Sequence, residues 1–391
     1  MDIEETKKFL IKEVENQRKS LKEISRKVHS NPELGFHEEK AAELLTNYLK
    51  GNGFVVELGI CRLPTAFKAV YGKGKPEIAI LAEYDALPEI GHACGHNIIA
   101  TSAVGAGVAA RLAVDEYGGS VLVIGTPAEE LYGGKIVMAE RNAFNNLDAA
   151  MMVHPGTTDT ATTEALACHT LDVEFIGKST HAAASPEEGI NALEALLLSF
   201  MGINSLRQHI RSTARIHGVV TNGGEAANIV PAYSSGNFIV RAADNAYLEE
   251  LKERVLDCFR GAAKATGAEM KYKWDDVCYS PMQNNFTLAG LFAANMKILG
   301  RNTSISEPER SFGSTDMGNV SQIVPGMHGI VRIADKNVLV HSPEFAEAAI
   351  SDRGIEGMID ASKAMAMTVA DILSSTDIQT AIKEEFYGSA Q

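Results

Sequence analysis

The sequence predicts an α/β protein: a catalytic-type domain with a mostly parallel sheet and helices on both faces, interrupted by a smaller α+β domain. Three short, unbroken apolar runs, at residues 78–82, 121–124 and 149–153, are typical of strands that are buried on both faces. An alanine-rich helical stretch from Ile98 to about Leu112 lies between the first two runs, and this alternation indicates parallel strands. From Thr170 onward apolar residues alternate with polar ones, which is the period of a strand with one solvated face.

Two helices are predicted before the first buried strand. In the first 30 residues, apolar side chains recur at spacings of seven, three and four, which puts them on one helix face. A turn at Asn31-Pro32 follows, and a second helix is expected from about His37 to Lys50. The segment 51–53, with a glycine at each end, stops it.

Residues 170–283 are expected to form the inserted domain. The expected elements are a strand from residue 170, a helix around residues 193–203, strands at about 215–221 and 233–241, a helix around 248–259 and a strand at 270–274. The order βαββαβ is that of a ferredoxin-like unit. The insertion divides the catalytic domain into residues 1–169 and 284–391, and the second part is expected to end in a long helix around 354–374.

Composition narrows the classes of function. The 391 residues include 36 Lys and Arg against 50 Asp and Glu, a formal charge of −14, which argues against nucleic-acid and anionic-membrane partners. The acidic, amphipathic N-terminus does not resemble a signal peptide, and no run of about 18 uncharged apolar residues predicts a membrane span. Five scattered cysteines do not form a disulfide framework. A cytoplasmic protein is therefore expected.

Metal-ligating residue types follow all three predicted strands at their carboxyl ends, where open α/β sheets bind ligands. They are Asp85, Cys94 and His96 after the first run, Glu129 and Glu130 after the second, and His154 after the third. The predicted strands thus bring thiol, imidazole and carboxyl groups to one edge of the sheet. Together these groups form the ligand set of zinc or a neighbouring divalent ion.

The spacing of these residues suits metal-assisted chemistry. The glycine between Cys94 and His96 allows both side chains to turn toward one point from a tight loop. Adjacent Glu129 and Glu130 point in opposite directions on an extended segment, so one carboxylate coordinates while its neighbour faces the activated water as general base.

Each residue taken singly also has a purely structural explanation. Cys94 alone would be a small core residue, and Glu129 and Glu130 alone would be solvated charges. His154 would be a turn residue about as often as a ligand, and His92 is better explained by a structural hydrogen bond. Their position at successive strand ends is what favours the metal site.

Several motifs in a fixed order resemble one enzyme family over nearly the whole chain. They are Glu83-Tyr84-Asp85-Ala86-Leu87-Pro88, His92-Ala93-Cys94-Gly95-His96-Asn97, Pro127-Ala128-Glu129-Glu130, His154-Pro155-Gly156, Gly177-Lys178-Ser179-Thr180-His181-Ala182-Ala183, Asn228-Ile229-Val230-Pro231 and His341-Ser342-Pro343-Glu344. The chain resembles the amidohydrolase branch of the aminoacylase and carboxypeptidase G-type zinc peptidases. Within that branch it is most similar to the p-aminobenzoyl-glutamate hydrolase-like and cytosolic dipeptidase-like members.

The resemblance implies a metal centre that holds one or two Zn²⁺ or Mn²⁺ ions. It assigns Cys94, His96, Glu130, His154 and His341 as ligands, Glu129 as general base, and Asp85 as the carboxylate that orients an imidazole. The chain departs from the family pattern at two positions. Glu83 stands where carboxypeptidase-like members carry a histidine ligand, and Asn97 stands where many amidohydrolase-branch members have aspartate.

The resemblance also implies roles for the inserted domain, as a lid and a dimerisation surface. His181 would stabilise the oxyanion that develops at the scissile carbonyl, and Asn228 and Arg241 would meet the carboxylate or carbonyl of the substrate. Ser314 and Thr315 lie in a segment that resembles a substrate-contacting loop. For His181 a helix cap is the less common alternative, and for Arg241 a surface ion pair is about as common as substrate binding.

The expected activity is metal-dependent hydrolysis of the amide bond in small N-acyl amino acids, aryl-amidated amino acids or dipeptides, by a homo-oligomer. Because the net charge of −14 does not attract anions, local cations such as Arg241 must recognise a substrate carboxylate. Two other hypotheses remain at this point. One is a thiol hydrolase with Cys94 as nucleophile and His96 or His92 as base, and the other is a catalytically silent metal-binding assembly protein.

Overall fold

The computed structural model describes residues 2–305 and 313–388, which form two compact units. Among these residues the first unit comprises 2–164, 282–305 and 315–388, and the second comprises 165–281 and 313–314. The second unit begins ahead of the predicted residue 170, because its first strand already starts at Ala167. Residues 313–314 also belong to the second unit, although they come late in the chain, and no sequence pattern predicted this.

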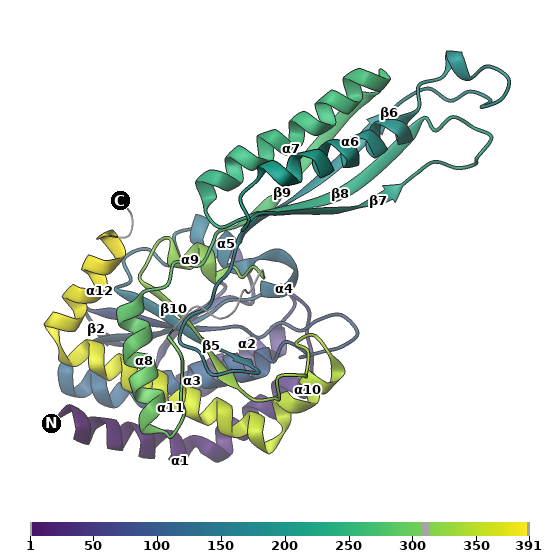
Figure 1. The fold of residues 1–391 in the computed structure, drawn as a ribbon. Coiled ribbons are helices and arrows are strands. Elements are labelled where there is room, and N and C mark those ends of the chain that lie inside the picture. Colours follow the sequence, from purple (N-terminus) through teal and green to yellow (C-terminus); the bar gives the residue numbers. More distant parts are fainter. Residues whose placement is uncertain (1, 306–312, 389–391) are drawn as a thin grey trace. The chain divides into compact units, whose positions relative to one another are not determined.

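The first unit is built on a sheet of six strands in the order β1-β2-β4-β3-β5-β10. Strands β2, β5 and β10 are labelled in Figure 1. The strands are β1 (Val55–Leu58), β2 (Phe67–Lys73), β3 (Glu77–Ala82), β4 (Gly119–Gly125), β5 (Ala149–Gly156) and β10 (Gly326–Arg332). The pairs β4–β3, β3–β5 and β5–β10 are parallel, whereas β1–β2 and β2–β4 are antiparallel. The mostly parallel sheet is therefore confirmed.

The predicted apolar runs are the three neighbouring central strands β4, β3 and β5. Strands β1, β2 and β10 were not predicted from the sequence. Each of these lacks a continuous apolar run: β1 and β2 carry charged residues, and β10 contains glycines and a histidine. Without such a run, period and composition do not distinguish a strand from a loop.

Helices cover both faces of this sheet, as predicted (Figure 1). They are α1 (Ile3–Ser30), α2 (Glu39–Gly51), α3 (His96–Tyr117), α4 (Glu129–Tyr132), α5 (Gly134–Glu140), α8 (Phe286–Ile298), α9 (Met317–Ser321), α10 (Pro343–Ile350), α11 (Asp352–Ser374) and α12 (Thr376–Gly388). Alternate residues of β3 show the two layers. Ile78 and Ile80 join the core formed with α1, α3 and α11, whereas Ala79 and Leu81 join the core formed with α5 and α9.

Helix α3 lies at the centre of the first unit, in contact with α1, α11 and the sheet. It is long and apolar enough to cross a membrane, but 89% of its most apolar window is buried inside the protein, so it is explained as a core helix. Glycines let it approach its neighbours closely. A Cβ atom on Gly107 would lie 2.3 Å from Cγ2 of Val123 in β4.

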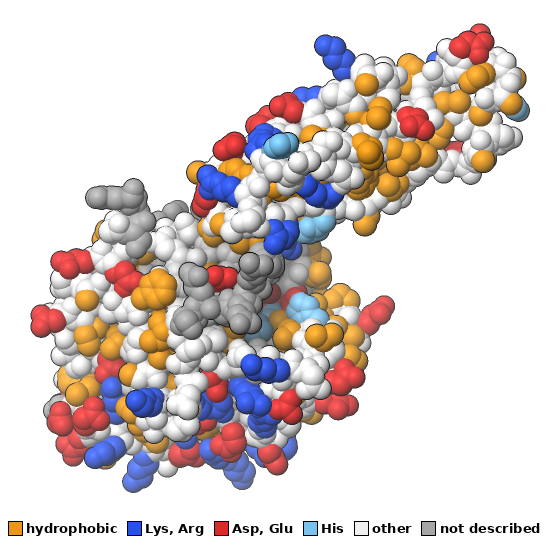
Figure 2. Space-filling model, viewed as in Figure 1, with side chains coloured by type: hydrophobic (Ala, Val, Ile, Leu, Met, Phe, Trp, Pro, Cys, Tyr) orange, Lys and Arg blue, Asp and Glu red, His pale blue; other side chains and the backbone are white. Residues whose placement is uncertain are grey.

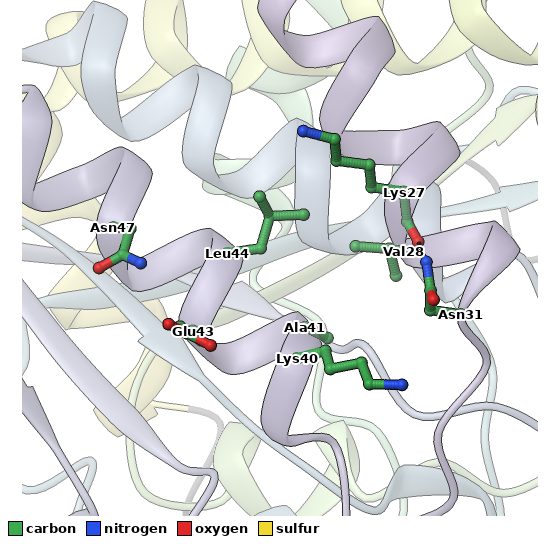
Figure 3. A pocket seen from close by; sticks show the side chains of 8 residues that line it. All are labelled: Lys27, Val28, Asn31, Lys40, Ala41, Glu43, Leu44 and Asn47. Atoms are coloured by element: carbon green, nitrogen blue, oxygen red, sulfur yellow. Dashed lines mark hydrogen bonds between the residues drawn. The ribbon is translucent and has the colours of Figure 1, made fainter.

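Helices α1 and α2 leave a surface groove of about 400 Å³ between them (Figure 3). Its lining combines apolar Val28, Ala41 and Leu44 with charged Lys27 and Lys40. None of the residues predicted for the metal centre lines this groove, so the two are separate features.

The second unit has the predicted order βαββαβ. Its elements are β6 (Ala167–Ile176), α6 (Ala192–Leu206), β7 (Arg215–Asn222), β8 (Tyr233–Ala242), α7 (Asn245–Thr266) and β9 (Glu269–Tyr279). The antiparallel sheet has the order β7-β8-β6-β9, and α6 and α7 pack on one of its faces around a separate core. Side chains of Asn191 and Asp244 cap the two helices by accepting hydrogen bonds from backbone N–H groups.

Replacing Gly107 by alanine should destabilise the first unit by about 1–3 kcal/mol, because the new methyl group meets Val123 in the packed core. Thermal or urea unfolding measures the change. The matched control is Gly290→Ala in α8, where an added Cβ would meet no atom within 4 Å and alanine favours the helix. Equal stability of the two variants would contradict the close packing of α3 on β4.

Candidate metal centre

The residues predicted for the metal centre lie together at the carboxyl edge of the first unit's sheet. Asp85 follows β3, Cys94 and His96 lie at the start of α3, Glu129 and Glu130 open α4 after β4, His154 lies in β5, and His341 precedes α10. Two tight backbone positions place them: Gly95, with φ +81°, precedes α3, and Ala128, with φ +63°, precedes α4. Parallel strands that end at one edge bring these distant segments together.

The candidate ligands form two groups that share Cys94. One consists of Cys94, His96 and His154, and the other of Cys94, Glu130 and His341; within each group one ligand atom per residue lies within 4.8 Å of the others. Cys94 Sγ is 3.3 Å from His154 Nε2, and His341 Nε2 is 3.4 Å from Glu130 Oε1. The five predicted ligand residues therefore lie together as two adjoining groups that have Cys94 in common.

Asp85 orients both groups. Its Oδ1 lies 2.9 Å from His96 Nδ1, and its Oδ2 accepts a hydrogen bond from the Glu130 backbone N–H at 3.0 Å. With Nδ1 engaged, His96 turns Nε2 toward the ligand groups, 3.7 Å from Glu130 Oε1. This is the arrangement by which a carboxylate fixes the orientation of a metal-binding imidazole.

Unpaired polar atoms show that the site fits a cation. In the described parts of the chain, His96 Nε2 and Glu130 Oε1 are buried atoms with no hydrogen-bond partner. Buried polar atoms are normally paired, and a metal ion would satisfy both of these at once. Burial also raises the pKa of the Cys94 thiol, so a neighbouring cation would be needed to hold this side chain as a thiolate.

The thiol-hydrolase hypothesis fits these surroundings poorly. A nucleophilic cysteine needs a lowered pKa, whereas burial raises the pKa of Cys94. Burial lowers the pKa of His92 to about 3, and this side chain stands beside His29, with ring centroids 6.0 Å apart, outside both ligand groups. His92 therefore lies outside the ligand groups, but neither of its ring nitrogens has a hydrogen-bond partner among the described residues, so the structural hydrogen bond that the sequence favoured is not seen.

Glu129 lies next to the ligand groups but faces a different set of neighbours. One of its oxygens lies within 4.8 Å of ligand atoms of His96 and Glu130. The Glu129 carboxylate also lies close to those of Glu83 and Asp316, with one oxygen of each residue within 4.8 Å of the others. Loss of solvent and the charges of Glu83 and Asp316 raise the pKa of Glu129 well above its usual value. A carboxylate with such a pKa is suited to accept a proton and to pass it on.

Sequence reasoning missed residues that border this site. Buried Lys135 at the start of α5 forms ion pairs with Glu83 and Asp316, and buried His328 of β10 lies with its ring 5.8 Å from that of His154. The sequence signal that could have pointed to Lys135 is the position of this charged residue directly before the apolar segment Ile136-Val137-Met138. Nothing local to His328 pointed to the site, because its place depends on the pairing of β10 with β5.

The remaining predicted residues belong mostly to the second unit. His181 is exposed and its Nδ1 accepts a hydrogen bond from the Ala183 N–H at 3.2 Å, while the Ala182 N–H donates to the Asn228 carbonyl at 2.9 Å. Arg241 Nη1 donates to Ser314 Oγ at 2.7 Å. These residues therefore form two local clusters within the unit.

Ser314 and Thr315 are neighbours in sequence but belong to different units. Ser314 Oγ also donates to the Leu166 carbonyl, within the second unit. Thr315 is buried in the first unit, where its Oγ1 accepts a hydrogen bond from the Met317 N–H at 3.3 Å as α9 begins. The chain therefore passes from one unit to the other between these two residues.

Comparison with known proteins assigns the family. The model of peptidase family M20/M25/M40 matches residues 79–361, which is more than half of the chain. The chain belongs to this peptidase family. It is a metal-dependent peptidase or amidohydrolase, and the family predicted from the motifs is confirmed.

Two curated relatives and one solved structure illustrate the similarity. The chain is 36% identical to the Xaa-Arg dipeptidase of Mus musculus, over 98% of this chain and 93% of that one. It is 34% identical to one of the p-aminobenzoyl-glutamate hydrolase chains of Escherichia coli, over 72% of this chain and 63% of that one. A dinuclear metal-binding peptidase of the M20 family from Bacillus subtilis has the same fold, with a TM-score of 0.73, 22% identity, and coverage of 92% of this chain and 99% of that one.

Metal binding should stabilise the protein through the candidate ligands. Addition of Zn²⁺ or Mn²⁺ to metal-free protein should raise the unfolding midpoint, because an ion that binds only the folded state adds about 2.7 kcal/mol at 100 times its dissociation constant. The change His341→Ala should reduce this shift by more than half, since it removes a ligand whose side chain is 52% exposed and contributes little to packing. Calorimetry measures both shifts.

The control for this experiment is His209→Ala, which removes an exposed histidine of the second unit. It should show the same metal-induced shift as the unchanged protein. An undiminished shift in the His341 variant would contradict its assignment as a ligand.

Proposed function

We propose that the chain hydrolyses the amide bond of small dipeptides or N-acyl amino acids at a centre of two divalent metal ions. The observation that carries the proposal is the pair of ligand groups joined by Cys94, with the carboxylate of Glu129 beside them. The residues that would hold the ions are the five candidate ligands: Cys94, His96, His154, Glu130 and His341. Zn²⁺ and Mn²⁺ both suit such ligands.

Glu129 acts as the general base. When bound, the ions would polarise the scissile carbonyl and activate the attacking water. Glu129 takes the proton of that water and later gives it to the leaving nitrogen, which its raised pKa supports. Asp85 keeps His96 and the Glu130 backbone in place throughout, through the hydrogen bonds described above.

The second unit supplies substrate recognition in this proposal. His181 stabilises the developing oxyanion, and Asn228 and Arg241 bind the substrate's carboxylate or carbonyl. Arg241 is held by Ser314, which keeps its guanidinium in a fixed direction. Ser314 and Thr315 complete the contact with substrate, and closure of the inserted domain would exclude water from the reaction.

The relatives narrow the substrate class. One is named as a dipeptidase for Xaa-Arg bonds and another as a p-aminobenzoyl-glutamate hydrolase, so both cleave an amide next to an amino acid. We therefore propose dipeptides as the first substrates to assay, with aryl-amidated and N-acyl amino acids next. A cytoplasmic location belongs to the same proposal, because the five cysteines are free and free thiols suit a reducing compartment.

Replacing Glu129 by glutamine should leave metal content and folding intact and reduce kcat by at least about 100-fold, because the amide cannot accept the proton. Metal analysis and turnover of a dipeptide panel measure the two properties. Glu140→Gln, which changes an exposed glutamate at the end of α5, is the matched control and should keep full activity.

This experiment also separates the proposal from the two other hypotheses. Turnover that survives in the Glu129 variant would exclude Glu129 as the base. Metal binding without any turnover in the unchanged protein would instead favour the assembly protein. Loss of activity on treatment with a chelator, restored by added metal, would distinguish the metalloenzyme from a thiol hydrolase.

The second unit also presents a surface suited to dimer formation. Among the described residues β7 pairs only with β8, so it is an edge of its sheet, and edge strands offer unpaired backbone groups to a partner. Exposed apolar side chains accompany this edge on β7 and α6: Val219, Val220, Leu197, Leu198 and Met201. Figure 2 shows hydrophobic side chains gathered along this unit. We propose that two copies of the chain associate through this surface.

Changing Val219 to lysine should weaken the dimer, because the charge would be buried against an apolar partner surface at a cost of several kcal/mol. Sedimentation equilibrium measures the dissociation constant, which should rise at least tenfold. Val55→Lys alters a still more exposed valine on β1, an edge strand of the other sheet, and should leave association unchanged. A monomeric unchanged protein would exclude the proposed dimer.

A further inference from the structure

Lys135 is a buried cation beside the proposed catalytic base. Its side chain has 0% exposure, and its ammonium group forms ion pairs with the Glu83 carboxylate and, at 2.7 Å, with Asp316 Oδ1. Asp316 Oδ2 also accepts a hydrogen bond from the Lys135 backbone N–H at 2.9 Å. Asp316 therefore binds both ends of this residue, and the ammonium group of Lys135 lies between Asp316 and Glu83.

Glu83 turns its two carboxylate oxygens to different partners. Oε1 is bound by Lys135, whereas Oε2 is buried, has no hydrogen-bond partner among the described residues, and lies 3.5 Å from His96 Nε2. That nitrogen is the atom of His96 that faces the candidate ligands, because Nδ1 is engaged by Asp85. An unpaired carboxylate oxygen in such a position is costly unless it serves the site.

The same cluster surrounds Glu129. Oxygen atoms of Glu83, Glu129 and Asp316 lie within 4.8 Å of one another, and Lys135 is the cation bound between two of them. Without its ammonium group, these carboxylates would face one another uncompensated. Like charges in a buried site move apart or take up protons, and either change would displace Glu129.

We propose that Lys135 is a positioning residue for the hydrolytic reaction: fixed by Asp316, it holds Glu83 so that the free oxygen of Glu83 faces the metal centre beside Glu129. This inference rests on the proposed function. Glu83 is thereby a second positioning residue. Its carboxylate lies at the edge of the centre and is assigned neither as a metal ligand nor as the general base. Lys135 acts only through Glu83 and Asp316 and touches no reacting atom.

The test compares Lys135→Met, Glu83→Gln and the double variant. Methionine keeps the unbranched chain of lysine as far as Cε but lacks the charged Nζ, and glutamine keeps the shape of Glu83. Each single variant should lower kcat by about 10- to 100-fold with KM changed less than threefold, the range expected for residues that orient a metal site. Because Lys135 acts through Glu83, the two substitutions should not be additive. The kcat of the double variant should be no more than about threefold below that of the less active single variant.

A readout independent of turnover accompanies the kinetics. The visible spectrum of Co²⁺-loaded protein reports the surroundings of the ion, and it should shift in the same direction in both single variants but not in His209→Ala. If Lys135→Met fails to fold, the variant Lys135→Met/Asp316→Asn is used in its place, because it leaves the net charge of the cluster unchanged. Glu83→Gln retains the Lys135–Asp316 pair and should fold in any case.

The outcomes distinguish this inference from the proposed function. If the unchanged protein shows no hydrolysis of the substrate panel, the proposed function fails. If it hydrolyses substrate while kcat and the Co²⁺ spectrum are unchanged in Lys135→Met and Glu83→Gln, only the positioning role is excluded. Lowered thermal stability with unchanged kcat would likewise assign Lys135 to the fold alone.

Discussion

The site depends most directly on the carboxylate of Asp85. One oxygen engages His96 and the other accepts the Glu130 N–H, so a single side chain after β3 sets the direction of a ligand from α3 and a ligand from α4. Burial opposes the charge of Asp85, but the imidazole of His96 and the hydrogen bond from Glu130 lower its pKa and keep it ionised. The two groups of candidate ligands thus share one orienting carboxylate.

Charge balance explains why so many ionisable groups remain at this edge of the sheet. Glu83, Glu129, Glu130 and Asp316 bring carboxylates close together, and Lys135 supplies one compensating cation. The buried, unpaired atoms of His96 and Glu130 mark the place where further positive charge fits. Such clusters are poor for stability and are typical of functional sites.

The parallel sheet makes this density of charge possible. Strands β4, β3 and β5 are neighbours that end at the same edge, and apolar cores on both faces hold them in register. The rigid centre of the unit therefore supports the ligands, while the groups that we assign to substrate recognition lie mostly in a separate unit with its own core. This division suits an enzyme that must exclude water from the reaction and then release its products.

Local sequence patterns determined the central strands, the βαββαβ order of the insertion, and the set of Asp85, Cys94, His96, Glu129, Glu130 and His154 at successive strand ends. Each of these depends on residues adjacent in the chain. His341 was placed only by family resemblance, because its position depends on a left-handed backbone turn and a hydrogen bond to the Ala93 carbonyl. The lid and dimerisation roles of the insertion remain predictions.

Only the tertiary structure decided three features of the site and its surroundings. They are the Lys135–Asp316 ion pair, the packing of His328 beside His154, and the assignment of Ser314 and Thr315 to different units. These features join segments between which sequence period and turn chemistry carry no information. The strand ends could be inferred because a buried parallel strand is recognised from its own few residues. A buried ion pair or a ligand from a distant loop is determined by packing between segments, and it becomes visible only when the chain is folded.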